Sequence, residues 1–137
     1  MKTSARNELT GKITSIIDGA VMSEVKITVT AEVTVSATVT KEGLSSLGAK
    51  LNDEVTAIIK ASSIIITKDA VKTTARNVIK GKVIEVNKGA VNSEVKLSLG
   101  TATISAIVTN DAIEDLSIKV SEDAYAIIKA SSVILMA

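Results

Sequence analysis

A short polar segment near the N-terminus combines a hydroxyl group with a guanidinium group. Ser4 precedes Arg6 and Asn7, and the same residue types return at Thr74 and Arg76. A hydroxyl and a guanidinium can donate hydrogen bonds to the same oxyanion, and hydrogen bonds that involve a charged group are stronger than neutral ones. The alternative is that Ser4 begins a turn and Arg6 forms a surface ion pair. These residues alone leave both interpretations open.

A second polar segment interrupts an apolar stretch in each half of the chain. The sequence IKASS occupies residues 59–63 and again residues 128–132. Serine and alanine pack poorly in strands, so the segment breaks the strand pattern around it. A lysine beside a hydroxyl group and successive backbone N–H groups can form a concave anion site. The alternative is a plain turn between two strands.

A third repeated segment is rich in small residues. Residues 19–24 read GAVMSE and residues 89–94 read GAVNSE. By itself this pattern is typical of a tight turn that leads into a strand. Its small residues would also let the backbone of another chain approach closely.

The three segments recur because the chain is a tandem repeat. Residues 19–26 match residues 89–96 at a spacing of 70 except at Met22, which corresponds to Asn92, whereas residues 57–63 are identical to residues 126–132 at a spacing of 69. A run of seven identical residues indicates duplication rather than chance. The change of spacing means that the second copy lacks one residue, and we expect this loss in the hairpin near Gly100.

The duplication divides the chain of 137 residues into two small units. We place the first unit at residues 1–68 and the second at residues 72–137, with residues 69–71 as the linker. A unit of this size buries a smaller fraction of its surface than a full-sized domain does. Neither unit contains Cys, Trp or Phe to reinforce its core. Each unit should therefore be marginally stable alone, and we expect association with further copies of the chain.

The hydrophobic periodicity within each unit is that of β-strands. Residues 24–39 alternate apolar and polar side chains and are rich in Val, Ile and Thr, with a turn at residues 30–32. The corresponding turn of the second unit contains Gly100, which adopts a positive φ at low cost. Further strands of the first unit are expected at residues 10–17, 54–60 and 63–66.

The segment between the third and fourth strands predicts a brief helical turn. It occupies residues 40–51 and Gly48 is expected to end it, and the segment NDAIEDLSIKV is its counterpart in the second unit. Five short strands with one such turn are typical of a small, partly closed barrel of the OB-like kind. The sequence therefore predicts an all-β chain of two tandem five-stranded barrels.

The composition excludes several classes of function. The chain contains no His and no Cys, which removes serine–histidine and cysteine–histidine catalysis, disulfides and the commonest ligands of a metal cation. We therefore expect a protein that is not an enzyme, with no catalytic residue, no metal bound as a free cation and no cofactor.

The charge balance argues against nucleic acid and membranes as partners. The net charge is +1, with 8 basic and 8 acidic residues before position 70 and 8 and 7 after it, in total 16 and 15. Tyr125 is the only aromatic residue, whereas proteins that hold single strands stack bases on several aromatic rings. No segment reaches the roughly 18 continuous apolar residues of a membrane span, and the N-terminus is polar. These features predict a soluble, cytoplasmic protein.

The repeated segments resemble the signature of a known family. The run SARN at residues 4–7, the segments GAVMSEV and GAVNSEV, the IVT at residues 107–109 and the two IKASS runs are similar to those of the molbindins, which are molybdate-binding proteins built from Mop domains. The resemblance covers nearly the whole chain, once in each unit, as in the double-domain molbindins.

The resemblance implies two classes of oxyanion site. Transferred to this sequence, the first class comprises Ser4, Arg6, Thr40, Lys60, Ala61 and Ser62, with Thr74, Arg76, Thr109, Lys129, Ala130 and Ser131 in the second unit. The second class uses backbone donors around the Gly-Ala-Val turns, at Ala20, Val21, Ser23, Ala90, Val91 and Ser93. Met22 stands where the second turn has the polar Asn92, which sets the first turn apart.

The resemblance further implies a cytoplasmic store or buffer of molybdate and tungstate in molybdenum homeostasis, with the oxyanions held between the subunits of a homotrimer. The residues suit such a ligand, because a tetrahedral dianion accepts hydrogen bonds and donates none. Two alternatives stay open. One is a structural or interaction module that binds no ligand, and the other is an OB-type barrel that binds oligonucleotide or carbohydrate.

Overall fold

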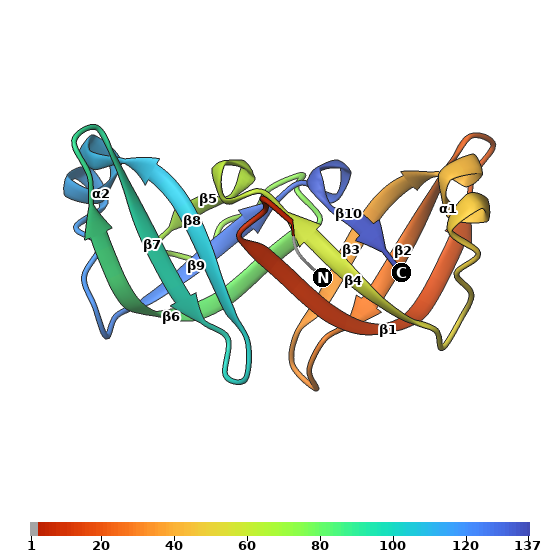
Figure 1. Cartoon of the computed structure of the whole chain (residues 1–137). Helices are drawn as coiled ribbons and strands as arrows, with labels where there is room; N and C mark the ends of the chain where they lie inside the picture. The colour runs from red at the N-terminus through yellow and green to blue at the C-terminus, as the bar shows by residue number, and fades with distance from the viewer. Residues whose placement is uncertain (1–2) are drawn as a thin grey trace.

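Two five-stranded antiparallel sheets form two lobes that lie side by side (Figure 1). The computed structural model describes residues 3–137, so the predicted start of the first unit at Met1 lies outside the described residues. The first half of the chain forms β1 (Asn7–Asp18), β2 (Met22–Thr28), β3 (Thr34–Thr40), α1 (Lys41–Leu47), β4 (Glu54–Ile59), η1 (Ala61–Ser63) and β5 (Ile65–Thr67). The second half forms β6 (Asn77–Lys88), β7 (Asn92–Ser98), β8 (Thr103–Thr109), α2 (Asn110–Leu116), β9 (Asp123–Ile128), η2 (Ala130–Ser132) and β10 (Ile134–Met136). The predicted all-β class and five-stranded architecture are confirmed.

Alternating apolar residues place one face of each sheet in a core. Leu9 and Ile13 of β1 are buried, and Val25 and Ile27 of β2 have no exposed surface. Successive side chains of a strand point to opposite faces, so a period of two in the sequence becomes one buried and one exposed face. Burial of one such branched side chain stabilises the fold by roughly 1.5 to 3 kcal/mol.

The long strand β1 bends so that it can pair with two partners. It pairs with β4 through residues 7–12 and with β2 through residues 12–18, with an irregularity of the register between Ile13 and Ser15. Gly11 lies in this region, where an added Cβ atom would be 2.3 Å from the carbonyl oxygen of Thr28. A β-bulge and a glycine together let the strand curve, and β6 repeats the irregularity in the other lobe.

The loops that follow the second strand of each half differ by one residue. The loop between β2 and β3 occupies residues 29–33, and the loop between β7 and β8 occupies residues 99–102. Gly100 has a φ of 101°, and Gly48, which follows α1, has a φ of 71°. The predicted site of the lost residue, the positive φ of Gly100 and the end of the helical turn at Gly48 are therefore confirmed.

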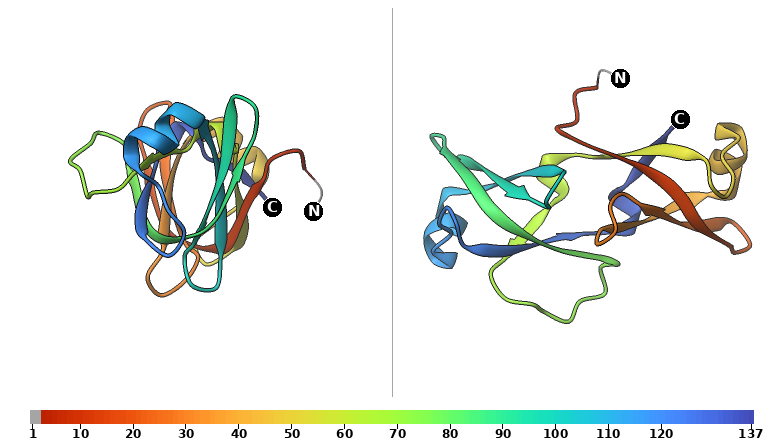
Figure 2. Two further views of the ribbon diagram at one scale, coloured as in Figure 1. Left: turned by 90° about the vertical axis from the view of Figure 1, so that its left-hand side faces the viewer. Right: turned by 90° about the horizontal axis from the view of Figure 1, so that it is seen from below.

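Each sheet takes its fifth strand from the other half of the chain. The strand order is β10–β4–β1–β2–β3 in one sheet and β5–β9–β6–β7–β8 in the other. We expected the strand at residues 63–66 to complete the barrel of its own unit, but β5 crosses to β9 and β10 crosses to β4 (Figure 2). The unit boundaries at residues 1–68 and 72–137 remain a prediction about the sequence repeat. In the structure, each sheet takes four strands from one unit and one strand from the other.

The physical reason for the exchange lies in the short turn before each fifth strand. The three residues of η1 and of η2 carry the chain onward into the neighbouring lobe, instead of reversing it beside β4 or β9. A fifth strand would meet equivalent residues whether it paired within its own repeat or with the other repeat. Ile134 pairs with Ile58, and the equivalent Ile65 pairs with Ile127. The alternation of side chains is thus satisfied equally by either pairing.

Two buried asparagines join the lobes. The Nδ2 of Asn7 donates to the carbonyl oxygens of Ser105 (2.8 Å) and Ile59 (3.2 Å), and its Oδ1 accepts from the N–H of Ser105 (2.7 Å). Asn77 makes the equivalent pair of bonds with the backbone of Ser36, at 2.8 and 2.7 Å. Each asparagine therefore binds the backbone of an edge strand in the opposite sheet, β8 or β3, and satisfies groups that the sheet leaves unpaired.

Removal of residues 134–137 tests the strand exchange. We expect the truncated chain to lose amide protection in β4 at residues 56–58 and to retain it in β9 at residues 125–127, because β10 pairs with β4 whereas β9 pairs with β5. Hydrogen exchange should become at least roughly tenfold faster in β4, as expected for a strand that loses its edge partner. Faster exchange confined to β9 would show that β10 completes its own repeat.

Candidate functional site

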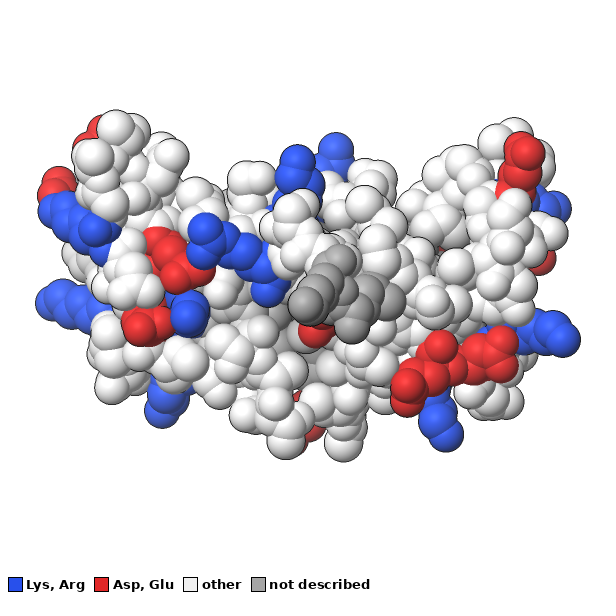
Figure 3. All heavy atoms as spheres, in the orientation of Figure 1, with Lys and Arg blue, Asp and Glu red and all other residues white. Residues whose placement is uncertain are grey.

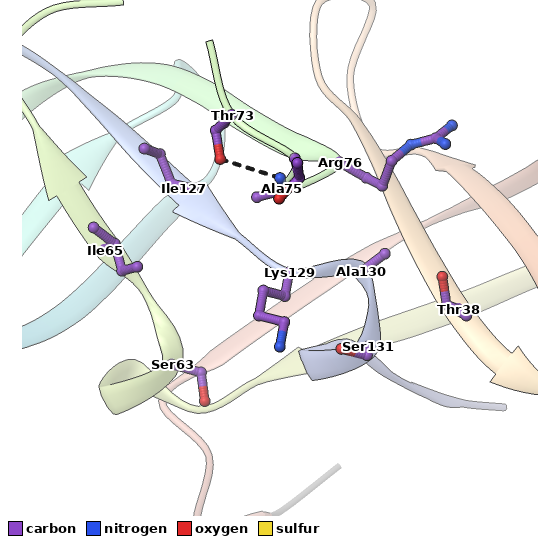
Figure 4. Close-up of a pocket in the computed structure, with 11 residues that line it drawn as sticks. Thr38, Ser63, Ile65, Thr73, Ala75, Arg76, Ile127, Lys129, Ala130 and Ser131 are labelled. Atoms are coloured by element: carbon purple, nitrogen blue, oxygen red, sulfur yellow. Dashed lines mark hydrogen bonds between the residues drawn. The ribbon is translucent and has the colours of Figure 1, made fainter. Parts of the chain in front are cut away.

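Two pockets occupy equivalent places where the lobes meet. One has a volume of about 460 Å³, and its lining includes Thr74, Arg76, Lys129, Ala130 and Ser131 (Figure 4). The other has a volume of about 470 Å³, and its lining includes Ser4, Arg6, Lys60, Ala61 and Ser62. We call them the Lys129 pocket and the Lys60 pocket. The structure therefore brings together five of the six residues of the first site class in each repeat.

Both pockets are completed by residues of the opposite half of the chain, which the sequence interpretation missed. The Lys129 pocket also contains Thr38, Ser63 and Ile65. The Lys60 pocket also contains Ile107, Ile134 and Met136. These residues lie on or beside the exchanged strands and the edge strands, so they reach a pocket only because β5 and β10 change lobes. The equivalence of Thr38 with Ile107 and of Ile65 with Ile134, at a spacing of 69, was visible in the sequence, but the position of these residues beside the other repeat was not.

Lys60 and Lys129 hold the same position at the start of η1 and η2. Their carbonyl oxygens accept the first bonds of these turns, from the N–H groups of Ser63 and Ser132, each at 2.9 Å. Both side chains are exposed, and among residues 3–137 neither forms an ion pair. Figure 4 shows the amine of Lys129 between Ser63 and Ser131. Figure 3 shows basic side chains at the upper centre of the molecule with no acidic side chain beside them on that face.

Arg6 and Arg76 line the pockets but donate to carboxylates of the opposite repeat. Arg6 Nη1 lies 2.6 Å from Glu94 Oε2, and Arg76 Nη2 lies 2.9 Å from Glu24 Oε2. In Figure 4 the guanidinium of Arg76 is directed away from Lys129. The surface ion pair that the sequence left open as the alternative for Arg6 is therefore formed. Each arginine has to leave its carboxylate before it can reach an anion beside the lysine.

The carboxylate that holds Arg6 has additional support. Asn87 Nδ2 donates to Glu94 Oε1 at 3.2 Å. Partial burial opposes ionisation of Glu94, but the hydrogen bonds from Asn87 and Arg6 and the charges of Arg6 and Lys96 outweigh it and lower the pKa of Glu94. Ionised Glu94 therefore stabilises the fold above the unfolded-state pKa, and this contribution is lost as the pH falls through the lower folded-state pKa. Ile17 takes the place of Asn87 in the first half and offers no donor.

Thr40 and Thr109 are absent from the linings of both pockets. Each ends the third strand of its repeat and acts as the N-cap of the following helix. Their hydroxyl oxygens accept hydrogen bonds from the N–H groups of Gly43 (2.9 Å) and Ala112 (3.1 Å). Helix capping accounts for a threonine at these positions. Within one chain, the two threonines are thus separated from the other residues of the first site class.

The Gly-Ala-Val turns lie at the outer ends of the molecule, beside α1 and α2 (Figure 1). Val21 and Val91 are 69% and 71% exposed, and Ala20 and Ala90 are exposed as well. The hydroxyls of the two serines of this site class are buried and already bonded, that of Ser23 to Asp18 Oδ1 at 2.6 Å and that of Ser93 to Asn110 Oδ1. The exposed backbone of the turns, rather than the serine hydroxyls, is therefore the accessible part of the second site class.

The described part of the chain shows neither a metal centre nor a membrane-spanning helix. Among residues 3–137, no three or more His, Cys, Asp or Glu side chains are grouped so that they could hold a metal ion. In the same range, no helix is both long enough and apolar enough to cross a membrane.

Two small β-lobes with paired basic pockets define a binding module rather than a catalytic centre. The family model of the TOBE domain matches the chain twice, at residues 3–66 and 73–135. The chain therefore belongs to the TOBE-domain family and carries two such domains in tandem.

Several relatives of known description are similar over the whole chain. The molybdenum transport protein ModE of Azotobacter vinelandii is 39% identical over 98% of this chain and 51% of its own length. The molybdenum-pterin-binding protein MopA of Rhodobacter capsulatus is 34% identical over 98% of this chain and 52% of its own length. The chain thus spans about half the length of these curated relatives.

A solved structure shares the fold of the whole chain. The cytoplasmic molybdate-binding protein ModG, crystallised with molybdate bound, is 38% identical, covers 99% of both chains and superposes with a TM-score of 0.95. Together these comparisons confirm the resemblance to tandem Mop-domain proteins. They also agree with the expectation of a binding protein rather than an enzyme, since the relatives are named for transport or binding.

Proposed function

We propose that the chain binds molybdate in the Lys60 and Lys129 pockets. The observation that carries the proposal is the composition of the pockets: among the described residues 3–137, each lining combines hydroxyls with a lysine that forms no ion pair, and it contains no Asp or Glu. The similarity to molybdate-bound ModG over 99% of both chains supports this choice of ligand.

The donor set matches the chemistry of a tetrahedral dianion. Molybdate accepts hydrogen bonds through its oxygens and offers no donor, so a carboxylate in the lining would repel it. Removal of a dianion from water is costly unless a positive charge lies nearby, and Lys60 or Lys129 provides that charge. Tungstate has nearly the same size and charge, so we propose that it binds as well. Sulfate is smaller and should bind more weakly, because a rigid ring of donors would leave some of its hydrogen bonds stretched.

We further propose a cytoplasmic role in the storage or buffering of these oxyanions, as part of molybdenum homeostasis. The exposed Thr40, Thr109 and Gly-Ala-Val turns lie away from the two pockets of their own chain. Their exposure supports a second set of sites that forms where subunits meet, with neighbouring chains completing the donors. No cofactor, nucleic acid or membrane takes part in this proposal.

Equilibrium dialysis against sodium molybdate tests the proposed function. We expect saturable uptake of molybdate, competition by tungstate and much weaker competition by sulfate at the same concentration. No uptake of molybdate would favour the alternative of a structural or interaction module. Salt-sensitive binding to single-stranded oligonucleotides, without molybdate uptake, would favour the OB-type alternative.

A homotrimer is the expected assembly. Each repeat is small, apolar valines project at the turns, and the predicted donors at these turns need partners from another chain. Sedimentation equilibrium should give about 43 kDa, three times the chain mass of 14.2 kDa. A clean monomer at micromolar concentration would contradict both the trimer and the intersubunit sites.

A further inference from the structure

We propose that the two pockets of one chain are unequal, and that the Lys129 pocket binds the oxyanion more tightly than the Lys60 pocket. The proposal rests on the proposed function and names the residues that set the affinity of each pocket. Thr38 and Ile107 are the first determinant, and Ile17 and Asn87 are the second. All four lie in the repeat opposite to the lysine that they influence.

The shared donors of the two pockets are closely matched. Lysine, alanine and serine are identical in the two IKASS runs, and Ser4 corresponds to Thr74, which keeps the hydroxyl. A difference in affinity therefore has to come from residues outside these segments.

The wall contributed by the third strand differs between the pockets. Thr38 of β3 lines the Lys129 pocket, and Ile107 of β8 lines the Lys60 pocket at the equivalent position. Both side chains are half-buried, and Figure 4 shows no hydrogen bond from the hydroxyl of Thr38 to the other residues that line the Lys129 pocket. A free hydroxyl in the wall can donate to an oxyanion, whereas isoleucine cannot and leaves the oxygens on that side without a partner.

The carboxylates that bind Arg6 and Arg76 also differ in their surroundings, and this difference favours the same pocket. Thr38 lies directly opposite Glu24 in the sheet, and Ile107 lies directly opposite Glu94, so each carboxylate that holds an arginine borders the wall of the same pocket. Asn87 binds Glu94 and strengthens its hold on Arg6 at the Lys60 pocket.

At the Lys129 pocket, Arg76 Nη2 lies 3.0 and 2.9 Å from the two oxygens of Glu24, and we infer that Arg76 is less firmly held because no asparagine supports this carboxylate. Ile17 replaces the asparagine opposite Glu24 and gives that carboxylate no further bond. Arg76 can therefore turn from Glu24 toward a bound dianion at lower cost than Arg6 can leave Glu94. The hydroxyl of Thr38 and the more easily released Arg76 both favour tighter binding of the oxyanion in the Lys129 pocket.

Single-pocket variants test the inequality in the full chain. Lys60→Met leaves the Lys129 pocket intact, and Lys129→Met leaves the Lys60 pocket intact. We expect isothermal titration with sodium molybdate to give an affinity about three- to tenfold higher in Lys60→Met than in Lys129→Met, as one additional hydrogen bond implies. Equal affinities in the two variants would overturn the proposal.

Substitution of the wall residues and of Asn87 tests what causes the difference in affinity between the two pockets. Thr38→Val in the Lys60→Met chain keeps the shape and removes the hydroxyl, and it should lower the affinity by about three- to tenfold. Ile107→Thr in the Lys129→Met chain should raise the affinity, and Asn87→Ile should raise it further by loosening Arg6. Unchanged affinity in all three would overturn the assignment.

Two controls distinguish an effect on the bound oxyanion from an effect on folding or on side-chain volume. The thermal midpoint without molybdate is measured for each variant, and Ile107→Val replaces Ile107→Thr as a variant of similar volume that adds no hydroxyl and should leave the affinity unchanged. A gain in affinity with valine as large as with threonine would refute the role of the hydroxyl. Absence of molybdate binding by the wild-type chain would refute the proposed function itself, which is a different outcome from equal pockets.

Discussion

Replacement of both Lys60 and Lys129 by methionine should remove most of the molybdate affinity of the two pockets. Each lysine is exposed and forms no ion pair among residues 3–137, so its charge is available to the ligand rather than to the fold. Loss of one charge-assisted hydrogen bond is worth about 1.5 to 3 kcal/mol, which is roughly a ten- to hundredfold loss of affinity at each pocket. Methionine keeps most of the apolar stem, so packing along it should survive.

Calorimetry on both single variants and the double variant measures this effect. The thermal midpoint without ligand should change little, whereas the stabilisation produced by a given concentration of molybdate should shrink, because this stabilisation grows with the logarithm of the ligand concentration divided by Kd. Lys12→Met is the matched control, since Lys12 is an exposed strand lysine outside both pockets. Wild-type affinity and stoichiometry in the double variant would show that Lys60 and Lys129 are ordinary surface residues.

Asn7→Ala should be among the most destabilising single substitutions in the chain. Asn7 is 1% exposed, and its side chain makes three hydrogen bonds, to the carbonyls of Ile59 and Ser105 and from the N–H of Ser105. The substitution leaves buried backbone groups of Ser105 without partners, and each such group costs about 1 to 3 kcal/mol. We expect a loss of about 2 to 5 kcal/mol in the free energy of unfolding.

Urea unfolding followed by circular dichroism measures this loss. Asn77→Ala should behave in the same way but with a smaller loss, because Asn77 makes two hydrogen bonds, both to Ser36. Glu8→Ala, at the exposed neighbouring position of β1, is the control and should change the stability by less than about 0.5 kcal/mol. If Asn7→Ala matched Glu8→Ala, the asparagine would not hold the lobes together.

The local structure of the chain followed from the sequence because it depends on short-range chemistry. The alternation at residues 24–39 predicted the paired strands β2 and β3, since the period of two must place one set of side chains in the core. Gly100 and Gly48 predicted a turn and a helix end, because both positions need a positive φ.

The types of the pocket residues were also accessible from the sequence. The chemistry and repetition of the segments around Ser4 and Lys60 made them candidate anion donors, the resemblance added Ser62, and all three line one pocket. Arg6 was ambiguous, because a guanidinium pairs equally well with an oxyanion or with a carboxylate. Its partner Glu94 lies in the other repeat, and the sequence does not show that they meet.

The exchange of the fifth strands was decided by the tertiary structure alone. The repeats are nearly identical around the last two strands, so β4 can pair with β5 or with β10 without a change in the pattern of buried side chains. The sequence by itself determined the strands and the turns of each repeat, because these depend on neighbouring residues, and it suggested the candidate donor residues. Only the tertiary structure decided which repeat supplies the wall of each pocket, because that depends on where η1 and η2 direct the chain.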